Sequence, residues 1–186
     1  MRRQSDVSRS GRALEDRILS NLNREFLNNK SSLMAVSGKK LKKTAPSLWE
    51  ILAIPASNPN AKPKNKIEGD LDIIVINKKK PQIPCAILSC KTSVRERVTE
   101  TAFYAQIWKK RLPSIRVILV TSDAGVGGFS AKKWVSEWGT RKKPTKARSI
   151  AETYLDGVYS ENPKTRMGGK IKHVKNLGSD LKLRFD

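Results

Sequence analysis

The chain has 186 residues, with 38 lysines and arginines against 17 aspartates and glutamates, so its formal net charge is +21. This length suits one domain with a buried core, and the charge favours a polyanionic partner: nucleic acid first, with an anionic membrane surface or a ribosome as alternatives. No run of about 18 apolar residues exists and the N-terminus lacks the apolar core of a secretory signal, so neither a membrane-spanning helix nor secretion is expected.

The first third of the chain is expected to be largely helical. Residues 1–11 are polar and basic and are expected to be flexible, whereas apolar residues recur at helical spacing over 13–28 and predict an amphipathic helix. Four lysines within 37–46 indicate a solvated or DNA-facing stretch. A short helix is expected over 47–53 with its first serine as N-cap, followed by a Pro- and Asn-rich loop over 55–66.

The middle of the chain carries the sheet. Two strands are expected at 70–76 and 85–91, joined by an eight-residue connection. A helix follows over 94–111, with an apolar stripe that includes Thr101, and then a third strand over 115–121. This order of helix, two strands, helix and strand predicts an α/β fold with a mixed central β-sheet flanked by helices.

The C-terminal part is basic and less periodic. Residues 129–138 look helical, 141–148 form a charged loop, and 149–158 are again expected to be helical. The tail over 170–185 alternates weakly between polar and apolar residues and is expected to supply an edge strand.

The cysteines and the single histidine narrow the chemistry. Cys85 and Cys90 lie five residues apart on one expected strand, so we expect them to face opposite sides and to remain reduced, as in a cytoplasmic protein. Together with His173, they are too few and too scattered to predict a structural zinc site.

Three acids precede the first strand of the expected hairpin. Because side chains alternate along an extended segment, Glu68, Asp70 and Asp72 should share one side with Ile74 and Ile76. Such a cluster in a strongly basic chain is explained if the carboxylates hold a divalent cation, because Mg²⁺ prefers oxygen ligands.

The second strand of the hairpin ends on a lysine. Ser89 and Lys91 share one side of this strand, with Leu88 and Cys90 on the other. If the two strands pair, the carboxylates and the lysine converge, and a lysine beside a metal can orient or help to deprotonate a water that attacks a phosphodiester.

These segments resemble a known family of nucleases. The run Gly69-Asp-Leu-Asp-Ile-Ile-Val-Ile76, followed by Leu88-Ser-Cys-Lys-Thr-Ser93, resembles the PD-(D/E)xK nuclease superfamily, and Ser89 to Arg97 is similar to type II restriction endonucleases. The resemblance covers 67–121 and implies a restriction endonuclease-like core that binds Mg²⁺. It implies that Asp72 is the metal-binding aspartate, with Asp70 as a rival for that role, and that Lys91 is the lysine of the motif; in the hypothesis that follows, both Asp72 and Asp70 are expected to bind the metal.

The sequence departs from the pattern at one position. The second acid of the family normally lies two residues before the lysine, where this chain has Ser89. Some restriction enzymes of the superfamily take this acid from the following helix, where Glu100 is preferred over Glu96, which lies between two arginines. Glu15 on the first helix is a further candidate for a supporting ligand.

The resemblance leads to one functional hypothesis and two alternatives. We expect a single nuclease domain with a core at 12–121 and a DNA-contacting basic part at 122–186: an Mg²⁺-dependent type II restriction endonuclease on double-stranded DNA, acting as a homodimer. The alternatives are a structure-selective nuclease, of the Holliday-junction resolvase or repair type, and a non-catalytic nucleic-acid-binding protein. The basic residues expected to contact DNA are Lys78, Lys79, Lys80, Arg95, Arg97, Arg141, Lys142 and Lys143.

Overall fold

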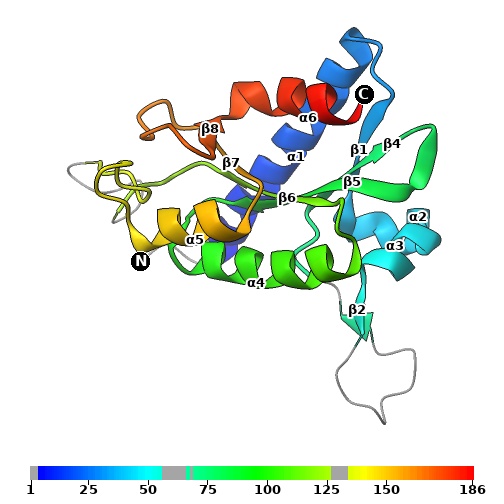
Figure 1. Ribbon diagram of the computed structural model, residues 1–186, viewed down its shortest axis with the longest axis horizontal. Coiled ribbons are helices and arrows are strands. Elements are labelled where there is room, and N and C mark those ends of the chain that lie inside the picture. The colour runs from blue at the N-terminus through cyan, green and yellow to red at the C-terminus, as the bar shows by residue number, and fades with distance from the viewer. Residues whose placement is uncertain (1–3, 56–65, 68, 127–133) are drawn as a thin grey trace.

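The computed structural model describes residues 4–55, 66–67, 69–126 and 134–186, with only the backbone described at 4–8, 55, 67, 95 and 96 (Figure 1). A mixed six-stranded sheet runs through the molecule in the order β1-β4-β5-β6-β7-β8. Its strands are β1 (Leu33–Ser37), β4 (Ile73–Asn77), β5 (Lys80–Lys91), β6 (Arg116–Thr121), β7 (Gly157–Ser160) and β8 (Ile171–His173). Strands β1, β4 and β5 pair antiparallel, whereas β5 through β8 are parallel.

Helices cover both faces of this sheet. On one face lie α1 (Gln4–Asn28) and α6 (Leu177–Phe185), and on the other lie α4 (Arg95–Arg111) and α5 (Lys146–Tyr154) (Figure 1). The smaller elements are η1 (Gly38–Lys40), α2 (Leu41–Thr44), α3 (Pro46–Leu52), η2 (Val174–Asn176) and a separate two-stranded sheet of β2 (Ile54–Pro55) and β3 (Lys66–Ile67). The predicted α/β fold with a mixed central sheet is therefore confirmed.

One hydrophobic cluster lies on each face of the sheet, so the central strands are buried on both faces. In β6, Val117 and Leu119 face the α4 side, whereas Ile118 and Val120 face α1. A continuous apolar run of this kind is typical of a strand covered by helices on both sides. In the described part of the chain, no helix is long and apolar enough to cross a membrane.

Three N-terminal features differ from the sequence prediction. Helix α1 begins at Gln4, well before the predicted start, and the five-residue strand β1 was not predicted. The 37–46 stretch forms η1 and α2, and its four lysines are exposed, in agreement with the solvated stretch that was predicted. The next helix, α3, begins at Pro46, so the N-cap is Ala45 and not Ser47; proline suits the first helical position because it has no N–H to leave unpaired.

The β4–β5 hairpin is tighter than predicted. Strand β5 already begins at Lys80, and the pairing shifts register between Val75 and Ile76, since Val75 opposes Ala86 and Ile76 opposes Pro84. The extra residue, Cys85, packs against the same cluster as Cys90, so the prediction that the two cysteines face opposite sides is wrong. A bulge changes the alternation of side chains along a strand.

Two C-terminal predictions are also corrected. Part of the helix predicted over 129–138 lies outside the described residues, and 134–138 is not helical. The helix predicted over 149–158 is α5, which ends at Tyr154, and the buried strand β7 follows it. The tail does supply an edge strand, β8, before it forms helix α6.

Candidate active site

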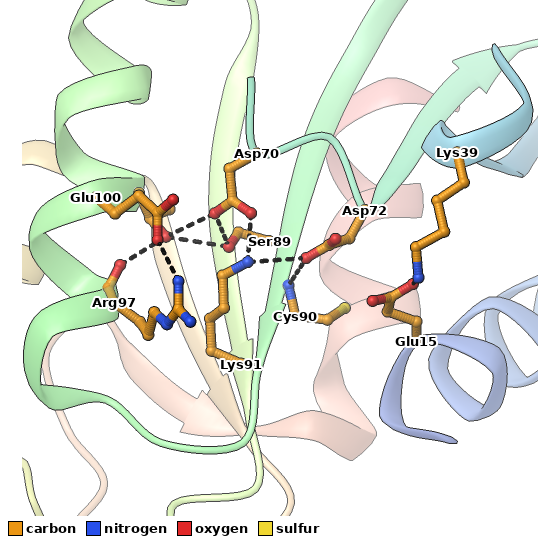
Figure 2. Close-up of polar contacts among 10 residues, drawn as sticks. Glu15, Lys39, Asp70, Asp72, Ser89, Cys90, Lys91, Arg97 and Glu100 are labelled. Atoms are coloured by element: carbon orange, nitrogen blue, oxygen red, sulfur yellow. Dashed lines mark hydrogen bonds and ion pairs between the residues drawn. The ribbon is translucent and has the colours of Figure 1, made fainter. Parts of the chain in front are cut away.

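The two acids before β4 and the lysine at the end of β5 meet in space (Figure 2). Lys91 Nζ contacts Asp70 Oδ1 and lies 3.3 Å from Asp72 Oδ2. Ile73 pairs with Leu88 in the antiparallel hairpin, so the entry to β4 and the exit from β5 lie at the same end. The structure thus brings these three predicted residues together. Glu68 lies outside the described residues.

Bends in the backbone, rather than strict alternation, direct the acids toward Lys91. Leu71 packs in the same core cluster as Ile74, whereas in a continuous strand these two side chains would point to opposite faces. The predicted strict alternation is therefore wrong between residues 71 and 74, although Asp70 and Asp72 converge. Gly38 makes the bend possible: its N–H donates to Asp72 O at 2.9 Å, and a Cβ at this position would collide with the Leu71 carbonyl.

Asp70 is enclosed by hydrogen-bond donors. Its side chain is 6 % exposed; Oδ1 accepts from Lys91 and Oδ2 accepts from Ser89 Oγ. Thr101 Oγ1, on α4, lies 3.1 Å from the same Oδ2 and 3.0 Å from Ser89 Oγ. Both carboxylate oxygens of Asp70 are therefore engaged by side chains of β5 and α4.

Asp72 is engaged on one oxygen only. Oδ2 accepts from the Cys90 backbone N–H at 2.7 Å and lies beside Lys91, whereas Oδ1 forms no hydrogen bond with any residue that the structure describes. Burial raises the pKa of Asp72, and Asp70 adds to this, while Lys91 opposes it. Asp72 therefore lies where its charged form is disfavoured even with Lys91 beside it.

Lys91 is the cation that balances the two acids. Burial alone would lower its pKa, but Asp70 and Asp72 outweigh burial and raise it. The ammonium therefore stays protonated when no metal is bound. Its side chain is 15 % exposed, at the border of a cavity.

The position of the missing acid is filled by a hydroxyl. Ser89 is buried and points to Thr101 and Asp70, as described above. Glu100, the preferred substitute, is 40 % exposed on α4 and pairs with Arg97 at 2.9 Å. It forms no salt bridge with Lys91 in the described part of the chain. The side chain of Glu96 is outside the described set.

A polar cavity of about 370 Å³ opens beside Lys91, between β5 and the N-terminal half of α1. Four charged side chains line it together with Lys91: Arg12, Glu15, Lys39 and Arg97. Glu15 pairs with Lys39 and is close enough to Asp72 to raise its pKa (Figure 2). The weaker sequence candidate, Glu15, therefore shares a cavity with Lys91. Lys39 belongs to the stretch predicted to be solvated or to face DNA, whereas Arg12 was not singled out, because one more basic residue in so basic a chain carries little signal.

The carboxylates at this site suit a magnesium ion. In the described part of the chain, no three or more His, Cys, Asp or Glu side chains are already placed to hold a metal. Mg²⁺ needs fewer protein ligands, since it is commonly held by one or two carboxylates together with waters and substrate phosphate. Asp72, with an oxygen that has no described partner, and Glu15 at the cavity wall meet that requirement.

A second polar region lies at the same end of the sheet, where β6 and β7 end. A cavity of about 790 Å³ lies between residues 134–140 and 163–167, and Lys164 and Arg166 line it. Both are exposed, and neither belongs to a salt bridge among the described residues. Sequence reasoning missed them, because they are isolated basic residues in a loop.

Two buried charges join the walls of this second cavity. Asp123 accepts from Ser136 Oγ at 2.9 Å and Thr165 Oγ1 at 2.6 Å, one from each wall. The fully buried Arg148 donates to Trp138 O at 3.1 Å and Gly168 O at 3.1 Å. These hydrogen bonds hold in place the two irregular loops that form the cavity walls, which have little regular secondary structure of their own.

The other basic residues predicted to contact DNA fall into three groups. Arg97 lines the cavity beside Lys91, while Arg95 lacks a described side chain. The exposed triplet 141–143 lies in the loop next to the second cavity. In contrast, 78–80 lies at the turn between β4 and β5, at the far end of the hairpin from Lys91 (Figure 1).

The sheet order, the flanking helices and the paired acids with a lysine define a restriction endonuclease-like fold. The solved structure titled as the specific restriction endonuclease AgeI in complex with DNA is similar to this chain, with a TM-score of 0.63 and 16 % sequence identity. The similarity covers 91 % of this chain and 62 % of the AgeI chain, so this chain spans less than two thirds of that protein.

Sequence comparison identifies the family. The sequence model of the BsaWI restriction endonuclease type 2 family matches residues 47–180. This match covers more than half of the chain and includes Asp70, Asp72 and Lys91. The chain therefore belongs to the BsaWI restriction endonuclease type 2 family. No curated protein sequence matches it.

Proposed function

We propose that the protein is a type II restriction endonuclease that hydrolyses phosphodiester bonds in double-stranded DNA with Mg²⁺. The observation that carries the proposal is the placement of Lys91 Nζ against Asp70 and Asp72 at the mouth of a polar cavity, in a chain of this family. The net charge of +21 supports a DNA substrate, because basic surfaces bind phosphate with release of counterions.

Asp72 is the proposed metal ligand, because its Oδ1 has no hydrogen-bond partner among the described residues. A bound Mg²⁺ would supply charge neutralisation on the phosphate and lower the pKa of a water. Lys91 would keep its proton, contact a phosphate oxygen in the cavity and hold the attacking water in place.

A further carboxylate is proposed from a helix, since Ser89 supplies none. Glu100 remains a candidate from α4, while Glu15 has the support of lining the same cavity as Lys91. The Glu15→Gln and Glu100→Gln variants decide between them: the ligand is the residue whose loss weakens Mg²⁺ binding in a calorimetric titration without DNA.

The exposed basic loops at the ends of β6 and β7 are the proposed DNA-contacting surface beside the active site. The triplet 141–143 with Lys164 and Arg166 forms this surface, which we call the basic loop surface. Phosphate contacts of this kind position a protein on DNA without reading its sequence. We further propose a homodimer in the cytoplasm, because a two-fold symmetric DNA site is matched by a two-fold symmetric protein.

The test is a digestion of plasmid DNA with Mg²⁺, and with EDTA as the control, followed by sequencing of the ends. Discrete fragments with one common end sequence support the proposal. Cleavage confined to branched DNA would indicate a structure-selective nuclease instead, and salt-sensitive binding with no products would indicate a non-catalytic DNA-binding protein.

A further inference from the structure

Ser89 and Thr101 place two buried hydroxyls against one carboxylate. Ser89 is 1 % exposed and Thr101 is fully buried, and both contact Oδ2 of Asp70. The single hydroxyl proton of Thr101 has a second possible acceptor, Arg97 O, which lies 3.0 Å away within the same helix. The catalytic roles proposed above leave these hydroxyls unexplained. Buried polar groups keep their partners, so the pair specifies where Asp70 can be.

Asp70 and Asp72 differ in what they can still bind. Asp70 has Oδ2 occupied by hydroxyls and Oδ1 occupied by Lys91, and it is the less exposed of the two acids, at 6 % against 14 %. Asp72 keeps Oδ1 without a partner among the described residues. A metal ion bound through Asp70 would compete with donors already in place, whereas Asp72 offers an unengaged oxygen.

We propose that Asp70 is a positioning residue that aims Lys91, and that Asp72 alone of the two acids binds the metal. Ser89 and Thr101 hold the Asp70 carboxylate, and Asp70 in turn holds the Lys91 ammonium at the cavity. The inference rests on the proposed nuclease function and deepens it.

The same contact explains why the family acid is absent from position 89. A carboxylate there would lie against the buried Asp70 carboxylate, and two like charges in contact in a buried site repel strongly. Serine instead donates a hydrogen bond to Asp70. Positions 70 and 89 therefore form a coupled pair, in which one carries the carboxylate and the other a neutral hydrogen-bonding partner.

A measurement of Mg²⁺ binding distinguishes the proposed roles of Asp70 and Asp72 directly. Mg²⁺ is titrated calorimetrically, without DNA, into the wild type, Asp70→Asn and Asp72→Asn. We expect Asp70→Asn to bind Mg²⁺ within about threefold of the wild type and Asp72→Asn to bind it at least about tenfold more weakly, since affinity depends on the carboxylates that contact the ion directly. Equal weakening in both variants would show that Asp70 is a ligand and overturn the inference.

Cleavage of a duplex oligonucleotide under single-turnover conditions tests the positioning role. Asp70→Asn is expected to slow cleavage about 100-fold while DNA affinity stays within about threefold, as for loss of an oriented catalytic group. Thr101→Ser keeps the hydroxyl and should cleave near the wild-type rate, whereas the isosteric Thr101→Val should be about tenfold slower. Equal rates for Thr101→Ser and Thr101→Val would contradict a role for the hydroxyl.

The coupled pair gives a test that a merely structural role would not pass. Ser89→Asp alone should be about 100-fold slower because of the like charges, and the double variant Asp70→Asn with Ser89→Asp should recover at least about tenfold over either single variant. Additive losses would overturn the coupling. A wild type that cleaves no DNA with Mg²⁺ would instead refute the proposed function, which the calorimetric comparison does not depend on.

Discussion

Asp70 and Asp123 are both buried, and each accepts hydrogen bonds on Oδ2 from one serine and one threonine hydroxyl. They differ at the other oxygen. Oδ1 of Asp70 accepts from the Lys91 ammonium, which borders a cavity, whereas Oδ1 of Asp123 accepts from the backbone N–H of Glu137 at 3.3 Å. One carboxylate thus holds a cation, and the other holds a loop.

The comparison indicates that a buried aspartate held by a serine and a threonine can serve catalysis or folding, depending on which group binds its other oxygen. The Asp123 site joins residues 134–138 to the loop after β7 and so supports the basic loop surface. Asp123 also has a φ of 43°, a backbone conformation that residues with side chains seldom adopt, so its hydrogen bonds must stabilise it. Substitutions at Asp70 should therefore reduce activity, and those at Asp123 should reduce stability.

The largest stability effect is expected for Asp123→Ala. The variant leaves two buried hydroxyls and a backbone N–H without their acceptor, which costs on the order of 3–5 kcal/mol in free energy of unfolding. Urea denaturation measures this loss. Asp70→Asn is the matched control, with an expected loss of less than about 1.5 kcal/mol, since asparagine can still accept hydrogen bonds through its carbonyl oxygen. Equal losses would remove the distinction between the two sites.

A smaller effect is expected when one hydroxyl is removed from each site. Ser136→Ala should lower the free energy of unfolding by about 1–2 kcal/mol without changing the cleavage rate of the folded enzyme. Ser89→Ala should do the reverse, with a cleavage rate about tenfold lower and nearly unchanged stability. Thermal unfolding and single-turnover cleavage are measured on the same samples. A slower cleavage by Ser136→Ala, or a loss of stability in Ser89→Ala, would contradict this assignment.

A more modest effect, on DNA binding, is expected when basic residues of the basic loop surface are replaced. Replacing Lys164 and Arg166 together by alanine is expected to reduce the slope of log K against log salt by about 1–2, with a several-fold loss of DNA affinity in Ca²⁺. The control is the double replacement of Lys78 and Lys79, at the far end of the hairpin, which should leave the slope unchanged. A larger change in the control would place the DNA at the opposite end of the sheet.

The smallest effect concerns acid stability. Burial would raise the pKa of Asp156, but Lys109, the Val117 N–H and Arg116 outweigh it and lower this pKa in the folded state. Such a group stabilises the fold above its unfolded pKa, and the stabilisation is lost as the pH falls through the folded pKa. Asp156→Asn should therefore flatten the decline of stability below about pH 4. Unfolding in urea between pH 3 and pH 6 measures this, and parallel curves for variant and wild type would contradict it.

The sequence predicts the central hairpin and the contact between Asp72 and Lys91, because these residues flank two apolar runs of strand length that pair with each other. It also predicts α4 and β6 from periodicity. The sequence does not predict β1 or β7, because a five-residue and a four-residue buried strand carry no alternation that distinguishes them from helix or loop.

The surroundings of the acids could not be predicted, because they depend on long-range packing. Thr101 interrupts the apolar stripe of α4, and this polar residue among apolar ones was the available signal for its contact with Asp70. Glu15 could not be ranked above Glu100, because the cavity between α1 and β5 arises only in the folded chain. The bends before β4 likewise depend on the close approach of Gly38.

The central claim is that Lys91, held against two acids, acts in Mg²⁺-dependent cleavage of DNA. The most direct test compares Lys91→Met with Lys78→Met in plasmid cleavage with Mg²⁺ and in DNA binding with Ca²⁺. Lys91→Met is predicted to cleave at least about 1,000-fold more slowly while it binds DNA within about tenfold of the wild type, and Lys78→Met to behave as the wild type. Cleavage by Lys91→Met at the wild-type rate would contradict the account.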